Sequence, residues 1–241
     1  CIDYVLEGVL DGEMVPDAER LETCIPISNL SMIKQLCTLL QAIIFTAEDA
    51  GDEGENTENS DEENAITEPD QLEGVFVFCI LWSIGGALNE SSRVKFNDLL
   101  TKIYVEGSGK NLYEFVYEPK ERRWEEWSEK VPEFKVPVPF KFNEIVVPTA
   151  ESVMYTYILD RHVAVAKPCL LVGEPGTAKT TVVQNYLFTR PASQWKRLEI
   201  NMSSRTSSFD VQKNIEATVE KRSGKIYGAP AGKKLAVFVD D

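Results

Sequence analysis

One stretch, residues 173–180 (Gly-Glu-Pro-Gly-Thr-Ala-Lys-Thr), constrains the fold of this chain more than any other. An apolar run at residues 169–172 precedes it, and residues 180–188 have the composition of a helix. A buried parallel strand, a glycine-bearing turn and a helix start are the parts of a phosphate-binding loop. Glycine lets backbone N–H groups approach phosphate oxygens, and the helix directs its unpaired N–H groups at the same anion. The sequence therefore predicts a strand–loop–helix unit that binds phosphate.

Two residues at the end of this stretch have chemical roles. Lys179 is expected to supply a positive charge to the β- and γ-phosphates, and Thr180 a hydroxyl to Mg²⁺. One position departs from the pattern G-x-x-x-x-G-K-[ST], because Ala178 stands where the last glycine is expected. Alanine is the smallest substitute and a helix start tolerates a Cβ atom, so we expect the loop to form. A chance glycine–proline turn before a surface lysine is the alternative, and the strand, lysine and helix in register argue against it.

The second half of such a site is an acidic residue at the end of another apolar strand. Residues 233–239 form a run of this kind, and Asp240 and Asp241 follow it. Asp240 is expected to hold Mg²⁺ directly or through water, together with Thr180. Asp241 stands at the position of a water-activating glutamate and is one methylene shorter. A solvated strand end with two acids is the alternative, which the upstream loop makes less favoured.

These motifs together resemble the third AAA+ module of a dynein heavy chain. The resemblance includes the loop, residues 201–206, 214–222 and 227–234, and the Val-Phe-Val-Asp-Asp strand end. The Glu-Pro-Gly-Thr-Ala loop and the Asp-Asp ending are similar to axonemal more than to cytoplasmic sequences. Upstream, residues 75–88 and 124–134 resemble the end of the preceding module and the connection to this one. The resemblance covers most of the chain except residues 46–71.

The resemblance implies an α/β fold class, a partial AAA+ P-loop core in which helices flank a parallel sheet. A mainly helical small (lid) domain of the preceding module, residues 1–110, comes before it, followed by a β-hairpin and proline-rich connector at 111–143. Residues 144–241 are then the first half of the next large domain, from Walker A to Walker B, with three strands and an incomplete sheet. The expected nucleotide contacts are Gly173, Glu174, Pro175, Gly176, Thr177, Ala178, Lys179 and Thr180, with Val146, Val147 and Pro148 beside the adenine.

The resemblance also implies a function. The intact parent is an ATPase, the ATP-driven microtubule motor of cilia and flagella, and this segment binds ATP or ADP with Mg²⁺ at a regulatory site. The implied partners are the rest of the same heavy chain's AAA+ ring, microtubules through the parent's stalk, and dynein intermediate and light chains through its tail. The implied location is the cytoplasm, the cytoskeleton and the ciliary or flagellar axoneme. The segment alone is expected to be inactive.

Two other functions fit parts of the sequence. A non-motor AAA+ remodelling ATPase would keep the loop and Asp240 but lack the two upstream segments. A nucleotide-free scaffold module is favoured if Ala178 and Asp241 are both disabling.

Composition excludes some partners. The formal net charge is −14, and eleven acidic residues lie between Glu48 and Asp70 with no Lys or Arg among them. Without this run the formal charge is −3, so no basic surface for nucleic acid is expected. Residues 46–71 cannot bury enough apolar surface to offset their ordering entropy, and we expect a disordered surface loop. An acidic element that docks on a basic partner is the alternative.

Several further features complete the prediction. The five cysteines are scattered, His162 is the sole histidine, and no spacing suits a metal, so we expect buried reduced thiols. No apolar stretch approaches the roughly 20 residues of a membrane span.

The apolar patterns and capping residues predict the helices and strands along the chain. The expected elements are a helical stripe over 2–10, a helix over 30–44 capped by Ser28 or Asn29, a buried helix over 72–88, a helix capped by Ser91 or Ser92, a hairpin over 111–127, a helix to about 166 capped by Thr149 or Ser152, strands over 167–172, 197–202 and 233–239, and a helix over 209–222.

Overall fold

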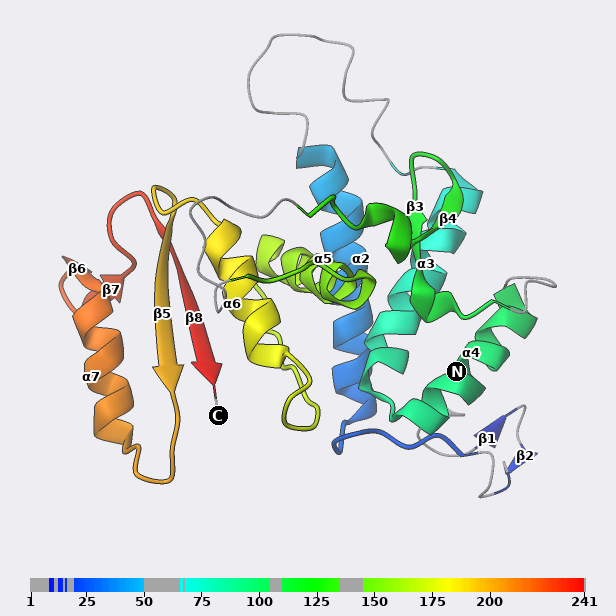
Figure 1. Cartoon of the computed structure of the whole chain (residues 1–241), viewed down its shortest axis with the longest axis horizontal. Coiled ribbons are helices and arrows are strands. Elements are labelled where there is room, and N and C mark those ends of the chain that lie inside the picture. Colours follow the sequence, from blue (N-terminus) through cyan, green and yellow to red (C-terminus); the bar gives the residue numbers. More distant parts are fainter. Residues whose placement is uncertain are drawn as a thin grey trace, which may run out of the picture. The chain divides into compact units, whose positions relative to one another are not determined.

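The computed structural model of the 241-residue chain describes residues 9–10, 13–14, 16, 20–49, 66, 68–104, 110–134 and 145–240 (Figure 1). The chain divides into two compact units, Cys1–Leu170 and Leu171–Asp241, and each is described by itself. Within the described part, no helix is long and apolar enough to cross a membrane.

The first unit is mainly helical. Its longest helices pack on one another, with α3 against α2 and α5 against α2 (Figure 1). Two short antiparallel pairs accompany them. The elements are β1 (Val9–Leu10), β2 (Glu13–Met14), α2 (Asn29–Asp49), α3 (Pro69–Ser83), η2 (Gly85–Ala87), α4 (Glu90–Tyr104), η3 (Leu112–Glu114), β3 (Phe115–Glu118), β4 (Arg123–Glu126), η4 (Trp127–Lys130) and α5 (Ala150–Ala164).

Helix α3 is the centre of the core of this unit. Most of its residues from Gly74 to Ser83 are buried, which explains why its sequence is apolar on every face. Leu39 of α2 and Phe96 of α4 are fully buried and belong to the same hydrophobic cluster. Burying such a side chain contributes about 1.5–3 kcal/mol, so these contacts determine how the four helices associate.

Two tyrosines fit against glycines of α3 and η2. A Cβ atom on Gly74 would lie 2.2 Å from the ring of Tyr117, and one on Gly85 would lie 2.3 Å from the hydroxyl of Tyr113. The Tyr117 hydroxyl also donates to the backbone carbonyl of Asp70 at 3.1 Å. The hairpin of β3 and β4 and the turn before it therefore pack into the helical core.

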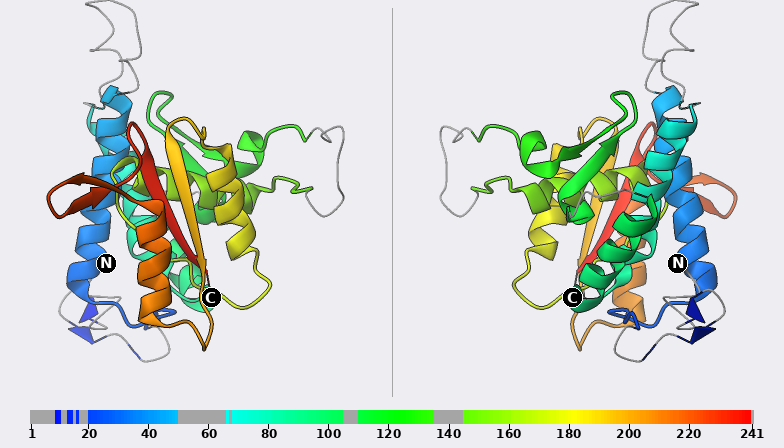
Figure 2. Two further views of the ribbon diagram at one scale, coloured as in Figure 1. Left: turned by 90° about the vertical axis from the view of Figure 1, so that its left-hand side faces the viewer. Right: turned by 90° about the vertical axis from the view of Figure 1, so that its right-hand side faces the viewer.

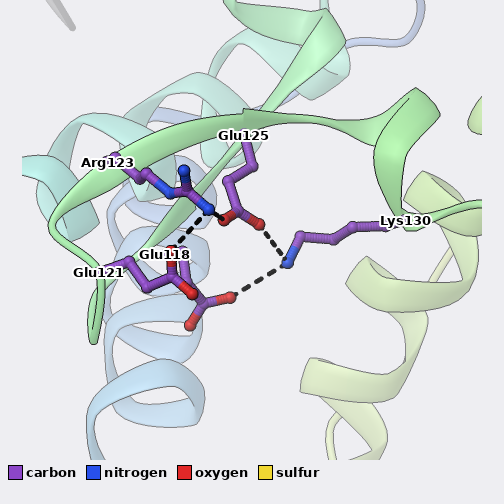
Figure 3. A network of polar contacts seen from close by, with 5 residues as sticks. All are labelled: Glu118, Glu121, Arg123, Glu125 and Lys130. Atoms are coloured by element: carbon purple, nitrogen blue, oxygen red, sulfur yellow. Dashed lines mark hydrogen bonds and ion pairs between the residues drawn. The ribbon is translucent and has the colours of Figure 1, made fainter.

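Charged side chains link the hairpin to η4 (Figure 3). The carboxylate of Glu125 lies 2.7 Å from the Arg123 guanidinium and 2.8 Å from the Lys130 ammonium. Arg123 also pairs with Glu121, and Lys130 with Glu118. The hydrogen bond from Lys130 is the main reason that the pKa of Glu125 is lowered. The network stabilises the charged form of Glu125.

The second unit contains a parallel pair of strands, β5 (Trp195–Asn201) and β8 (Lys234–Asp240), in register from Trp195↔Lys234 to Asn201↔Asp240. Helices α6 (Lys179–Thr189) and α7 (Ser208–Thr218) lie on opposite sides of this pair (Figures 1 and 2). A small antiparallel pair, β6 (Glu220–Ser223) and β7 (Ile226–Gly228), lies between α7 and β8 in sequence. The parallel strands and flanking helices confirm the predicted fold class, a partial AAA+ P-loop core.

Most of the expected helices and strands are present. Ser28 accepts the backbone N–H of Ser31 at the start of α2, and Thr149 forms a capping box with Ser152 at the start of α5, as predicted. The hairpin is formed by β3 and β4.

Several element predictions were wrong. Asn89, not Ser91 or Ser92, caps α4, because its side-chain carbonyl accepts the Ser92 N–H at 2.9 Å. The helix predicted over 209–222 ends at Thr218, since the residues after it pair as β6 and β7. Residues 9–10 are a strand paired with β2 rather than the end of a helix, and residues 1–8 lie outside the described part.

The strand predicted over 167–172 is not formed. No residue of this run pairs with β5 or β8, and Leu170 and Val172 are 77% and 51% exposed. An extended segment becomes a strand only when its backbone groups find a partner.

The prediction that the cysteines are buried holds for Cys79 among the described cysteines, and burial raises the pKa of its thiol to about 12. Cys24, Cys37 and Cys169 are exposed. Cys1 lies outside the described residues.

The predicted acidic loop over 46–71 is shorter at both ends. Helix α2 continues to Asp49, and α3 begins at Pro69 with a capping box between Glu68 and Gln71. Residues 50–65 and 67 lie outside the described part, so the loop stays a prediction there.

Candidate functional site

The candidate site is in the second unit, where residues 173–178 lead into helix α6. The loop turns through two residues with positive φ, Gly176 at 82° and Ala178 at 60°. Ala178 is the N-cap of α6 and has the left-handed conformation. The premise that a helix start tolerates a Cβ atom here was therefore wrong, because this region costs an L-residue about 1–2 kcal/mol. The loop forms with alanine, but in a conformation that glycine adopts more readily.

Lys179 ties the two ends of the loop together. Its ammonium donates to the backbone carbonyls of Gly173 at 2.9 Å and Glu174 at 2.7 Å, and to the hydroxyl of Thr177 at 3.2 Å. The Thr177 hydroxyl in turn donates to the Glu174 carbonyl at 2.8 Å. Sequence reasoning missed these contacts, because nothing in a motif states which carbonyls a lysine meets. They hold the ammonium at the mouth of the loop.

The N-terminus of α6 differs from those of four other helices of the chain. Side chains of Ser28, Asn89, Thr149 and Ser207 accept backbone N–H groups at the starts of α2, α4, α5 and α7. Helix α6 has no side-chain cap. The first N–H groups of a helix need an acceptor, and they carry the positive end of its dipole. An anion held by the loop is a suitable acceptor.

Thr180 and Asp240 meet beneath this loop. The Thr180 hydroxyl lies 3.0 Å from each carboxylate oxygen of Asp240, so the first turn of α6 and the last residue of β8 are in direct contact. Both side chains are half-buried. In parallel α/β sheets, ligands bind outside the carboxyl ends of the strands, which is where this pair lies.

The Thr180–Asp240 pair suits Mg²⁺. This ion prefers oxygen ligands and is usually bound by one or two carboxylates together with substrate phosphates. No group of three or more His, Cys, Asp or Glu side chains that could hold a metal occurs among the described residues. A metal at this site therefore requires the phosphates of a nucleotide as further ligands. A metal held there would neutralise negative charge on the phosphate oxygens.

Four predicted site residues are not among the described residues of the second unit. Val146, Val147 and Pro148 belong to the first unit, where Val146 and Val147 are 40% and 56% exposed. Their contact with adenine stays a prediction. Asp241 lies outside the described residues, so its role is likewise a prediction. Glu174 and Pro175 are exposed on the loop.

The second unit combines the loop and its lysine, an uncapped helix start and the threonine–aspartate pair on a parallel sheet with flanking helices. These features define the AAA+ P-loop class of fold. The comparisons with known proteins agree with this assignment. The profile of the P-loop containing dynein motor region matches residues 134–241, and that of the dynein heavy chain AAA lid domain matches residues 9–129. The chain belongs to the dynein heavy-chain family. The lid profile includes the hairpin, which agrees with its packing into the first unit.

The similar proteins are axonemal or flagellar heavy chains. The chain is 36% identical over its whole length to the dynein-1-alpha heavy chain of the flagellar inner arm I1 complex from Chlamydomonas reinhardtii. It is also 36% and 37% identical over its whole length to human dynein axonemal heavy chains 10 and 2. It spans about 5% of the length of each of these relatives.

Proposed function

We propose that this segment binds Mg-ATP or Mg-ADP at a regulatory AAA+ site of an axonemal dynein heavy chain. One observation carries the proposal: the Thr180 hydroxyl meets the Asp240 carboxylate directly behind a loop that presents Lys179. The three groups lie at one end of the parallel sheet, and they are the set that a Mg-nucleotide requires.

Each group has a distinct task in this proposal. The free N–H groups of α6 and the ammonium of Lys179 attract the β- and γ-phosphates. Thr180 and Asp240 supply oxygen ligands to the metal. The carbonyls of Gly173 and Glu174 keep the ammonium in place, so little ordering is needed when the nucleotide binds.

The proposal extends to the parent protein. We place the chain at the end of the second and the first half of the third AAA+ module, where the bound nucleotide gates the main hydrolytic module. The parent is then an ATP-driven microtubule motor of the cilium or flagellum. Its partners are its own AAA+ ring, microtubules at the stalk, and intermediate and light chains at the tail. The relatives are named as axonemal and flagellar heavy chains, which supports a location in the cilium or flagellum.

The test is a count of bound nucleotide in the intact heavy chain. Lys179→Ala is expected to remove about one equivalent of tightly bound nucleotide per heavy chain. Lys196→Ala, which removes an exposed lysine on β5, is the matched control and is expected to leave the count unchanged. Because Lys179 also holds the loop, the unfolding temperature of both variants is measured alongside.

The outcome distinguishes two functions. If Lys179→Ala and the wild type hold the same number of tightly bound nucleotides per heavy chain, this module holds none in the wild type. That result would favour a nucleotide-free scaffold module. The left-handed Ala178 is the observation in favour of that second candidate.

A further inference from the structure

The first unit contains a cavity that the nucleotide site does not use. It has a volume of about 760 Å³ and lies where α3, α4, η3, η4 and α5 meet. Four aromatic side chains line it, and two of them, Trp82 and Trp127, are buried, whereas Tyr155 is 36% exposed. Trp82 makes edge contacts with Tyr113 at 5.7 Å and Tyr155 at 6.5 Å between ring centroids. The cavity therefore has aromatic walls that already hold one another in place.

The charges around this cavity are strongly unequal. Glu90, Glu114, Glu126 and Glu151 line it, and all four are exposed. Among the lining residues that the structure describes, Arg93 is the one basic side chain. An excess of negative charge at an aromatic-walled opening attracts a cation.

Arg93 does not neutralise these carboxylates. Its guanidinium donates to the backbone carbonyls of Gly86 at 2.9 Å and Leu88 at 3.1 Å, and it lies over the ring of Tyr113 at 5.5 Å. These contacts hold Arg93 against η2. Four carboxylates and one guanidinium leave the described lining with an excess of negative charge.

The carboxylates are held by neutral donors. The Asn111 amide donates to Glu114 at 3.0 Å, and the Ser128 hydroxyl donates to Glu126 at 2.9 Å. Within the described ranges, no ion pair involves Glu90, Glu114, Glu126 or Glu151. By contrast, Glu125 on the same strand as Glu126 is paired with both Arg123 and Lys130. Glu114 and Glu126 are thus oriented by neutral donors and retain unused acceptor capacity.

A metal ion does not suit this rim. Among the residues that the structure describes, no three acidic or other metal-ligating side chains lie close enough to hold one. Carboxylates spread around an opening instead suit an extended organic cation that offers several N–H donors. The guanidinium of arginine is such a group, because its flat face stacks on aromatic rings and its edge donates to carboxylates.

We propose that this cavity binds an arginine side chain presented by a partner polypeptide. Tyr155, which is 36% exposed, accepts the guanidinium and its methylene stem, and the rim glutamates receive its N–H donors. The cavity then serves as an anchor point on the lid part of the chain. This interaction does not depend on nucleotide at residues 173–180.

The test is a titration of the 241-residue chain with the peptide acetyl-Gly-Arg-Gly-amide, read from the indole N–H NMR signals. The signals of Trp82 and Trp127 are expected to shift, and those of Trp124 and Trp195, outside the lining, are internal controls. The same peptide with citrulline has nearly the same shape without the charge. We expect saturable binding of the arginine peptide and at least fivefold weaker binding of the citrulline peptide.

Two variants locate the site. Glu126→Gln and Glu151→Gln are each expected to raise the Kd of the arginine peptide roughly two- to fivefold, the size of one exposed ion pair. Glu121→Gln, an exposed glutamate outside the cavity, is the matched control. Equal binding of arginine and citrulline peptides, an unchanged Kd in both cavity variants, or unshifted Trp82 and Trp127 signals would overturn the proposal. Tighter binding of acetyl-Gly-Lys-Gly-amide or of spermidine than of the arginine peptide would also overturn it, because the site would then select charge rather than a guanidinium.

Discussion

The hydroxyl of Thr180 donates to both carboxylate oxygens of Asp240, at 3.0 Å each, although 60 positions separate the two residues in the chain. The contact joins the first turn of α6 to the last residue of β8. It exists because β8 runs parallel to β5 and ends at the edge of the sheet where the loop lies. The two halves of the expected Mg-nucleotide site are therefore assembled within one compact unit.

The first prediction concerns Mg²⁺ at this pair. Thr180→Val replaces the hydroxyl by a methyl group of similar shape and removes one metal ligand and one charge-assisted hydrogen bond. We expect the gain in nucleotide affinity that Mg²⁺ provides to fall by about ten- to a hundredfold, the effect of losing about 1.5–3 kcal/mol. Affinity measured with Mg²⁺ and with EDTA in the intact heavy chain gives this ratio. Thr180→Ser keeps the hydroxyl and should retain the gain; an equal loss in both variants would contradict a ligand role.

The second prediction concerns the left-handed residue in the loop. Ala178→Gly relieves about 1–2 kcal/mol of backbone strain in the folded state. Against this, glycine gives the unfolded chain more conformational entropy, which destabilises the fold by about 0.4–1 kcal/mol. The free energy of unfolding should therefore rise by up to about 1 kcal/mol. Ala217→Gly makes the same substitution in the last turn of helix α7, at a right-handed position, and should lower it by less than about 1 kcal/mol. Denaturant unfolding of the two variants measures both signs, and a destabilised Ala178→Gly would mean that the loop is not strained.

The third prediction compares two neighbouring glycines of η2. Gly85→Ala would place a Cβ atom 2.3 Å from the Tyr113 hydroxyl and 2.8 Å from Phe96. Overpacking of this kind costs about 1–3 kcal/mol of stability. A Cβ atom on Gly86 meets only Trp82, at an ordinary 3.5 Å, so Gly86→Ala should change stability by less than about 0.5 kcal/mol. Chemical denaturation measures both, and equal effects would contradict the packing described for Tyr113.

The fourth prediction is a pH dependence of the hairpin. The pKa of Glu125 is lowered, mainly by the hydrogen bond from Lys130. A carboxyl group with a lowered folded-state pKa stabilises the fold above its unfolded pKa of roughly 4.3. This stability is lost as the pH falls through the folded-state value. Lys130→Met should raise the pKa of Glu125 towards the ordinary value, as a carbonyl-detected NMR titration measures, whereas Lys120→Met in the turn should not. Arg123 still lowers this pKa in the variant, so an unchanged rather than a low Glu125 pKa would contradict the Lys130–Glu125 pair in Figure 3.

Where a motif fixes local geometry, the sequence predicted which residues lie together, and their binding of nucleotide stays a prediction. Residues 173–180 and Asp240 were expected at one site, and the loop, the start of α6 and the end of β8 meet there. The helix caps at Ser28 and Thr149 were likewise predicted, because a cap depends only on the residues within one turn.

Features that depend on distant partners were not predictable. The run at 167–172 is apolar enough for a strand, but pairing is decided by which backbone edges are near. Ala178 gives no sign in the sequence of its positive φ beyond occupying a glycine position. The aromatic cavity is assembled from Trp82, Tyr113, Trp127 and Tyr155, which come from four separate elements and are connected by no spacing in the sequence.

The most direct test of the account is an electron cryomicroscopy map of the intact heavy chain in Mg-ADP. The account predicts phosphate density against the N–H groups of α6 and the ammonium of Lys179, with a metal peak beside Thr180 and Asp240. The Asp240→Asn variant should lose the metal peak before it loses the phosphate density. A map in which other modules of the same chain hold nucleotide while the loop at residues 173–180 holds none would contradict the account.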